Sequence, residues 1–218
     1  MKNSKIFGLA FVAMLAIGAT AVPVASAVKM TAESYPTTLT GASDQGIGNV
    51  VSVTAGSVSC PNSSYLGVLS AASTTVSVAP SFTGCSAFGF PGTMDVNECT
   101  LLLHGAEGSF SSTVDFVCPA GKEMTLTVLS AGTSKCMLHI PSQAGLETVT
   151  VKAVGAGATR ELTLDVNVTG IKYTHTAGTG IGACTSGSGS TGTLTAKTLI
   201  TGEKVPSGTG HVGIFPSL

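Results

Sequence analysis

The sequence predicts an all-β domain held together by disulfides. Short runs alternate apolar and polar residues with the period of a half-buried strand. Turn-forming residues separate these runs at intervals of roughly 8–12 residues, the spacing found in β-sandwiches. No run after the first 27 residues has the apolar stripe of an amphipathic helix, which disfavours parallel α/β folds. We therefore expect an antiparallel β-sandwich, Ig-like or jelly-roll-like, with about 10–12 strands, or alternatively two small β lobes.

Residues 1–27 have the layout of a secretory signal peptide. Lys2 and Lys5 give a positive start, an apolar stretch follows at 6–22, and Ala25-Ser26-Ala27 is a small-x-small cleavage site. A membrane anchor is the alternative, but the stretch is short and broken by glycine and proline, whereas a spanning helix needs about 20 apolar residues. We expect a mature domain at 28–218 without an integral membrane segment, secreted to the extracellular space or held at the cell surface.

All six cysteines follow this leader, and an even number in an exported chain indicates three disulfides. If residues 99–118 fold back as a hairpin, residues whose numbers sum to 217 face each other. Cys99 then faces Cys118 closely enough for a disulfide. The other two bridges follow by elimination if pairing is sequential, and the absence of a CxxC pair disfavours zinc. The expected bridges are Cys60–Cys85, Cys99–Cys118 and Cys136–Cys184.

The expected strands follow one another from residue 49 to residue 200. The clearest is 160–170, in which Leu162, Leu164, Val166 and Val168 share one face. Others are expected at 49–56, 74–82, 113–118, 122–129 and 147–154, with weaker copies at 171–176 and 192–200.

Turns are expected between these strands, wherever glycine, proline and serine gather. They include 90–92, 119–121 and the long stretch 178–192, whose low-complexity part 183–192 should be a loop tethered at Cys184. We expect one domain, and the alternative places a sub-boundary near 119–121.

Charged residues are scarce, at 10% of the chain against 43% hydrophobic residues. Residues 28–218 carry 8 basic and 11 acidic residues, a formal charge of −3, without a Lys/Arg cluster. Nucleic acid and anionic membranes are therefore not expected as partners. A surface of Thr, Ser, Gly and Ala suits packing against cell-envelope material or self-association. No cofactor is expected, because the glycine-rich stretches 155–160 and 178–184 precede no helix that could hold phosphate.

Candidate catalytic residues gather around the 99–118 hairpin. His104 points away from the Leu103 face, and Asp115 lies diagonally across from it, so a His–Asp contact is feasible. Glu98 and Asp115 are the foremost carboxylates for a hydrolase, which needs two acids across a cleft. No GxSxG motif occurs, and no two histidines have metal-ligand spacing. The acids of this region are Asp95, Glu98, Glu107, Asp115 and Glu123.

Three segments of the chain resemble a group of short exported bacterial proteins. They are FTGCSAFG at 82–89, the CTLLLH…VDFVCPAGK block at 99–122, and DVNVTGIKYT at 165–174. The proteins of that group carry a signal, spaced cysteines and Gly/Thr-rich strands, and they occur as multiple paralogues in actinobacteria. The group has no assigned activity, so the resemblance implies export and a β fold and transfers no site residues.

The sequence therefore favours a non-catalytic exported protein that acts by binding or by structural assembly. The alternative is a secreted hydrolase of glycans or esters that uses Glu98, Asp115 and His104. A small-ligand carrier is a minor alternative.

Overall fold

The computed structural model describes residues 27–44, 48–106, 111–130, 133–177, 184, 186–205 and 210–217. Within them the chain forms seventeen β-strands with antiparallel pairings, one 3₁₀ turn at Gly157–Thr159 and no α-helix. The prediction of an all-β, antiparallel fold is confirmed. The expected sandwich is not confirmed, because fifteen of the strands belong to one sheet. The expected number of strands is too low. Strands as short as β7 (Ser86–Ala87) and β16 (His211–Val212) contain too few residues to show an alternation of apolar and polar side chains.

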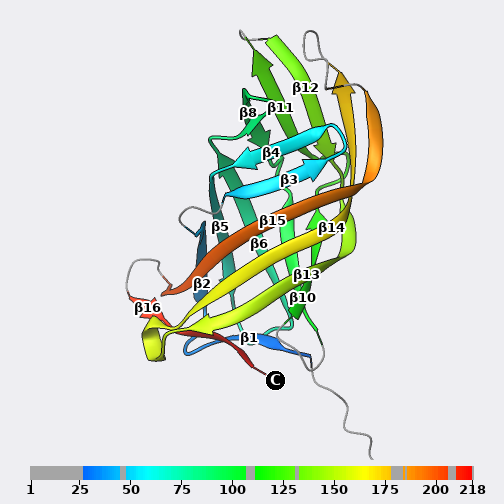
Figure 1. The fold of residues 1–218 in the computed structure, drawn as a ribbon. Coiled ribbons are helices and arrows are strands. Elements are labelled where there is room, and N and C mark those ends of the chain that lie inside the picture. Colours follow the sequence, from blue (N-terminus) through cyan, green and yellow to red (C-terminus); the bar gives the residue numbers. More distant parts are fainter. Residues whose placement is uncertain are drawn as a thin grey trace, which may run out of the picture.

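Two long strands form a ladder along the molecule (Figure 1). They are β14 (Glu161–Ala177) and β15 (Gly187–Lys204), each more than about 50 Å long at 3.3 Å per residue. Each pairs with two different neighbours on its other edge. The first part of β14 pairs with β13 (Gln143–Val154) and its last part with β12 (Thr133–Ile140). Likewise, β15 pairs first with β3 (Asn49–Val53) and then with β2 (Thr37–Ser43).

The remaining pairings close two circuits of strands on this ladder, which we call the lower ring and the upper ring from their places in Figure 1. Besides β14 and β15, the lower ring contains β2, β5 (Asn62–Leu69), β6 (Thr75–Thr83), β9 (Thr100–Gly105), β10 (Ser111–Val117) and β13. The upper ring contains β3, β4 (Gly56–Cys60), β7, β8 (Phe90–Asp95), β11 (Met124–Ser130) and β12. β1 (Lys29–Ala32) and β17 (Ile214–Ser217) form a separate two-stranded sheet beside the lower ring.

The chain enters the two rings alternately, one hairpin at a time. Between β4 and β13 it passes from ring to ring at five short segments, which we call crossings. The crossings are residue 61 and residues 84–85, 96–99, 118–123 and 141–142. No single cut of the chain therefore separates the rings. Residues 119–121 lie in one crossing, and the expected division of the chain into a leader and one domain stays a prediction.

Two of the three disulfides lie at the crossings. Cys60, at the end of β4, is bonded to Cys85, and Cys99 is bonded to Cys118. The third bridge joins Cys136 of β12 to Cys184, which lies between β14 and β15. All three predicted pairings are confirmed. The first two bridges lie where the two rings meet. We call this level of the molecule the waist.

One apolar core runs through both rings. Alternate residues point inward as the sequence predicts, and Leu162 and Val168 of β14 are fully buried. Three cavities among the inward-facing residues are small, each of about 40 Å³. Side chains therefore fill the interior almost completely.

Residues 187–192, expected to belong to a loop, are instead the first part of β15. Their glycines face large rings on β14. A Cβ on Gly189 would lie 2.4 Å from the Tyr173 hydroxyl, and one on Gly187 would lie 3.1 Å from the His175 ring. The Tyr173 hydroxyl also meets the Thr54 backbone N–H at 3.0 Å and the Thr54 hydroxyl at 2.7 Å. Glycine is thus required here by side-chain packing across the ladder rather than by a turn.

The turn expected at 90–92 is also wrong, because these residues begin β8. Gly92 faces Val128 of β11, and a Cβ on it would lie 3.3 Å from Leu126 and from the Thr127 carbonyl. Close approach of two strands, rather than a reversal of the chain, explains this glycine.

Gly189→Val should lower the free energy of unfolding by about 1–3 kcal/mol, the usual cost of overpacking a core. The added side chain must displace the Tyr173 ring and break its contact with Thr54. Urea unfolding of the oxidised protein measures the change. Ser190→Val, an exposed neighbour on the same strand, is the matched control and should change stability little. Equal stability of the two variants would contradict the close packing of β15 on β14.

Candidate functional site

The β9–β10 hairpin has the register predicted from the sequence. His104 faces Thr113 and Leu103 faces Val114, so that paired residue numbers sum to 217. The inward residues Leu103 and Val114 are buried in the core. Because this register continues to the ends of both strands, Cys99 and Cys118 meet at the waist and form their disulfide.

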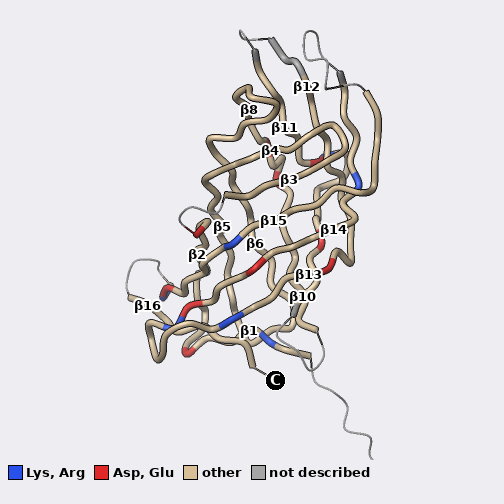
Figure 2. The backbone as a smooth tube through the Cα atoms, viewed as in Figure 1, with Lys and Arg blue, Asp and Glu red and all other residues tan. Residues whose placement is uncertain are grey.

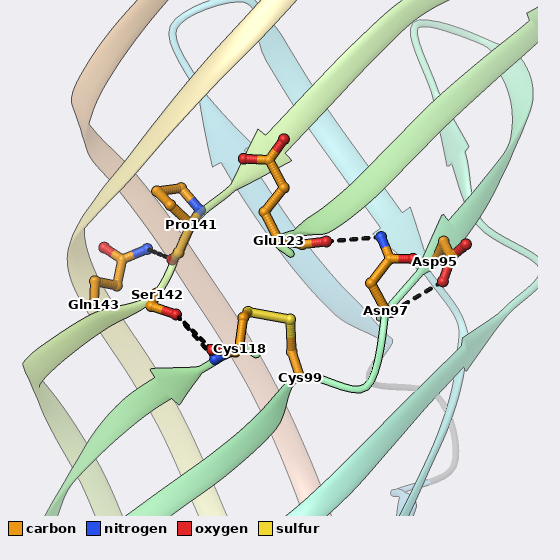
Figure 3. Close-up of a disulfide and its surroundings, with 8 residues drawn as sticks. All are labelled: Asp95, Asn97, Cys99, Cys118, Glu123, Pro141, Ser142 and Gln143. Carbon is orange, nitrogen blue, oxygen red and sulfur yellow. Dashed lines mark hydrogen bonds between the residues drawn. A yellow bond between two sulfur atoms is a disulfide. The ribbon is translucent and has the colours of Figure 1, made fainter. Parts of the chain in front are cut away.

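Three crossings meet at this disulfide (Figure 3). The Asn97 backbone N–H donates to Asp95 Oδ1 at 3.0 Å, and the Asn97 side-chain amide donates to the Glu123 carbonyl at 2.8 Å. On the other side, the Cys118 N–H donates to the Ser142 hydroxyl at 2.9 Å. Hydrogen bonds thus join the crossings to one another around the bridge, which is the arrangement expected of a structural joint.

The described acids of this region lie in separate interactions. Glu98 contacts the Lys122 ammonium at 2.5 Å, and Glu123 contacts His139 Nδ1 at 2.6 Å. Asp95 accepts the hydrogen bond that shapes the turn at Asn97. Glu107 lies outside the described residues. The acidic cluster seen in the sequence therefore resolves into individual pairs and not into a group of facing carboxylates.

The structure brings His104 and Asp115 together, as predicted. His104 Nε2 lies 2.8 Å from Asp115 Oδ2, and Asp115 Oδ1 accepts a hydrogen bond from the Gly145 N–H at 2.7 Å. The Gly145 hydrogen bond holds the pKa of Asp115 below its usual value, partial burial opposes this, and His104 adds to the lowering. Asp115 is thus a carboxylate that orients an imidazole, and it is a poor proton donor.

Glu98 and Asp115 do not face each other. Asp115 lies three residues before Cys118, about 10 Å along the strand, and Glu98 lies beyond the disulfide against Lys122. The carboxyl groups of a glycosidase lie about 5–9.5 Å apart across a cleft. The three cavities and two surface depressions found among the described residues are lined by other side chains.

Sequence reasoning missed a surface that the fold assembles from neutral residues. The fifty residues from Gln45 to Met94 contain no Asp, Glu, Lys, Arg or His. They supply β5, which pairs with β2 in the lower ring, and β6, which pairs with the other edge of β5. We define the uncharged face as nine outward residues of these three strands. They are Thr38, Thr40, Ala42, Ser64, Leu66, Val68, Ser77, Ala79 and Ser81.

Leu66 and Val68 stand out at the middle of the uncharged face, each 57% exposed on the central strand β5. Their neighbours across the strands are small or polar, since Leu66 pairs with Thr40 and Ala79. A surface depression of about 330 Å³ lies next to them between β2 and β15. The face therefore combines a protruding apolar pair with a hollow.

Two ion pairs lie over β13, β14 and β15, and one of them borders the uncharged face. Lys152 contacts Asp165 at 3.3 Å, and Lys197 contacts Asp44 at 3.0 Å. In Figure 2 the tubes of β3 and β4 carry no charged residue, whereas β13, β14 and β15 do. The uncharged face is therefore bordered by charged residues at β15, whereas β5 and β6 carry none.

Comparison with protein-family models, with curated proteins and with solved structures finds no match to this chain. The resemblance to exported actinobacterial proteins stays an expectation. Among the described residues, no helix has the length and apolar character needed to cross a membrane. In the same part of the chain, no three His, Cys, Asp or Glu side chains gather as a metal site would require.

Asp115→Asn should lower the free energy of unfolding by about 1 kcal/mol near pH 7, because a partly exposed, charge-assisted pair is lost. The folded-state pKa of Asp115 is lowered, so its stabilisation is present above the unfolded-state pKa of about 3.9 and is lost as pH falls further. Urea unfolding at several pH values should show the two proteins converging in acid.

The control for this measurement is Asp165→Asn, which removes an exposed pair with Lys152 and should change stability little. A loss in Asp115→Asn that is the same at neutral and at acid pH would contradict the assigned hydrogen bonds.

Replacing both Cys99 and Cys118 by alanine should lower the free energy of unfolding by about 3 kcal/mol, because the bridge closes a loop of 19 residues. Urea unfolding measures the loss. Thr100→Ala with Val117→Ala, the next pair in the register, keeps the bridge and should lose much less. A similar loss in both double variants would show that the bridge adds little to the hairpin.

Proposed function

We propose that this protein is an exported, non-catalytic protein of the cell surface or extracellular space, and that it acts by binding or by structural assembly. The observation that carries the proposal is the uncharged face, with Leu66 and Val68 exposed at its centre. A folded domain with few charges usually scatters them over its surface to stay soluble, and a neutral face with protruding apolar residues is typical of a contact surface.

Export is supported by the leader at 1–27 and by the bonded cysteines. Disulfides persist in oxidising compartments and are rare in the cytosol. All three disulfides join cysteines that are buried or half-buried, so they are structural disulfides. A fold that depends on three bridges suits a protein that works outside the cell.

A contact surface with this composition favours a neutral partner. Covering Thr, Ser and Ala side chains removes little strongly bound water and leaves no buried charge without a counter-charge. Cell-envelope polymers and other neutral protein surfaces meet that requirement. Attachment through such a face should depend weakly on salt, because ionic screening acts only on charges.

The two other readings have less support. For a hydrolase, Glu98 and Asp115 are held by different partners on either side of the disulfide. For a small-ligand carrier, the interior cavities of about 40 Å³ fall far below the ~300–1,000 Å³ of ligand pockets, and the depressions of about 330 Å³ and 390 Å³ lie open on the surface and do not enclose a ligand. These observations favour binding or structural assembly over both alternatives.

The test uses the mature, oxidised protein purified from culture medium. It should sediment with envelope material or form assemblies, and the bound fraction should change little between about 0.05 M and about 1 M NaCl. A protein that stays monomeric and touches no envelope material would contradict the proposal. A screen of glycan and ester substrates tests the hydrolase alternative, with Glu98→Gln and Asp115→Asn as controls. We expect no turnover that depends on Glu98 or Asp115.

A further inference from the structure

The uncharged face carries two features that fit each other. Leu66 and Val68 protrude from β5, and the hollow of about 330 Å³ lies beside them between β2 and β15. The hollow is lined by Thr40, Gly41, Ala42, Ser43, Asp44, Leu199 and Thr201. Its single acid, Asp44, is already bonded to Lys197 at 3.0 Å. The hollow is therefore a neutral site for an apolar side chain.

Resting on the proposed function, we infer that the partner of this face is a second copy of the same chain. The two copies pack their uncharged faces together across a two-fold axis. Leu66 of each copy then covers the hollow of the other, so that the same contact is made twice. A two-fold interface requires such self-complementarity, with protrusion and hollow on one surface.

Charge complementarity favours this partner over a charged one. A basic or acidic partner would bury its charges against Thr, Ser and Ala without a counter-ion, which is costly. A second copy brings an equally neutral surface. The Lys152–Asp165 pair lies on β13 and β14, away from the contact, and the one charged pair at the hollow, Asp44–Lys197, carries no net charge. Like-charge repulsion, the usual barrier between identical copies, is thus weak at the centre of this face, because β5 and β6 carry no charged residue.

The size of the face sets the strength of the pairing. Three strands of seven to nine residues cover about 14 Å by 25 Å, or about 350 Å² for each copy. The pair would bury about 700 Å² in total, below the ~1,200 Å² of stable complexes, so dimers should be weak in dilute solution. Copies concentrated on one surface would pair far more readily, because their local concentration is high.

The experiment is sedimentation equilibrium of the mature, oxidised protein from about 1 µM to about 1 mM. Wild type should show a monomer–dimer equilibrium that depends little on salt. Leu66→Glu and Val68→Glu should each weaken association by about tenfold or more, because a charge is buried without a partner. Circular dichroism and thiol titration confirm that each variant is folded and oxidised.

Val154→Lys is the matched control, since Val154 is 51% exposed on β13 and pairs with Glu161, away from the face. It should associate as wild type does. A second measurement mixes Leu66→Glu with Leu66→Lys. The mixture should form heterodimers more readily than either variant forms homodimers, and salt should weaken this preference.

The outcomes separate this inference from the proposed function. If wild type stays monomeric at the highest concentration but attaches to envelope material, the inference of self-pairing is wrong and the proposed function stands. Loss of that attachment in Leu66→Glu would assign the face to an envelope partner and overturn self-pairing. Association that is unchanged in Leu66→Glu would also overturn it. A monomer that attaches to nothing would contradict both proposals.

Discussion

The hydrogen-bonded ladder between β14 and β15 is the constraint on which the rest of the structure depends. Both rings use it as their closing pair. The ladder changes neighbours near Gly170, where the register shifts between Val168 and Ile171 and the glycine has a φ of 77°. A bulge at this position bends the strand between the two rings. Without the ladder, both rings would open and expose unpaired strand edges.

Local sequence patterns predicted those parts of the fold that local geometry determines. The hairpin register was predicted by pairing residues whose numbers sum to 217. This register places Cys99 against Cys118 and His104 near Asp115. Alternation likewise predicted the buried face of β14. In each case the information lies within a few residues, so the pattern and the structure agree.

Features set by distant residues could not be predicted in this way. Residues 187–192 look like a flexible loop until Tyr173 and His175 are known to lie across from them. The alternation of hairpins between the rings leaves no local pattern, since each hairpin resembles the next. The uncharged run from Gln45 to Met94 was visible in the sequence, but only the pairing of β2, β5 and β6 turns it into a surface.

The interleaved path of the chain has a consequence for biosynthesis. The closing ladder comes from the C-terminal quarter of the chain, so neither ring can be completed until that part has emerged. The earlier hairpins can pair only with each other in the meantime, and contacts between distant segments form slowly. Pairing of the earlier hairpins first, followed by closure of both rings once the last strands arrive, is the order of events that this topology imposes.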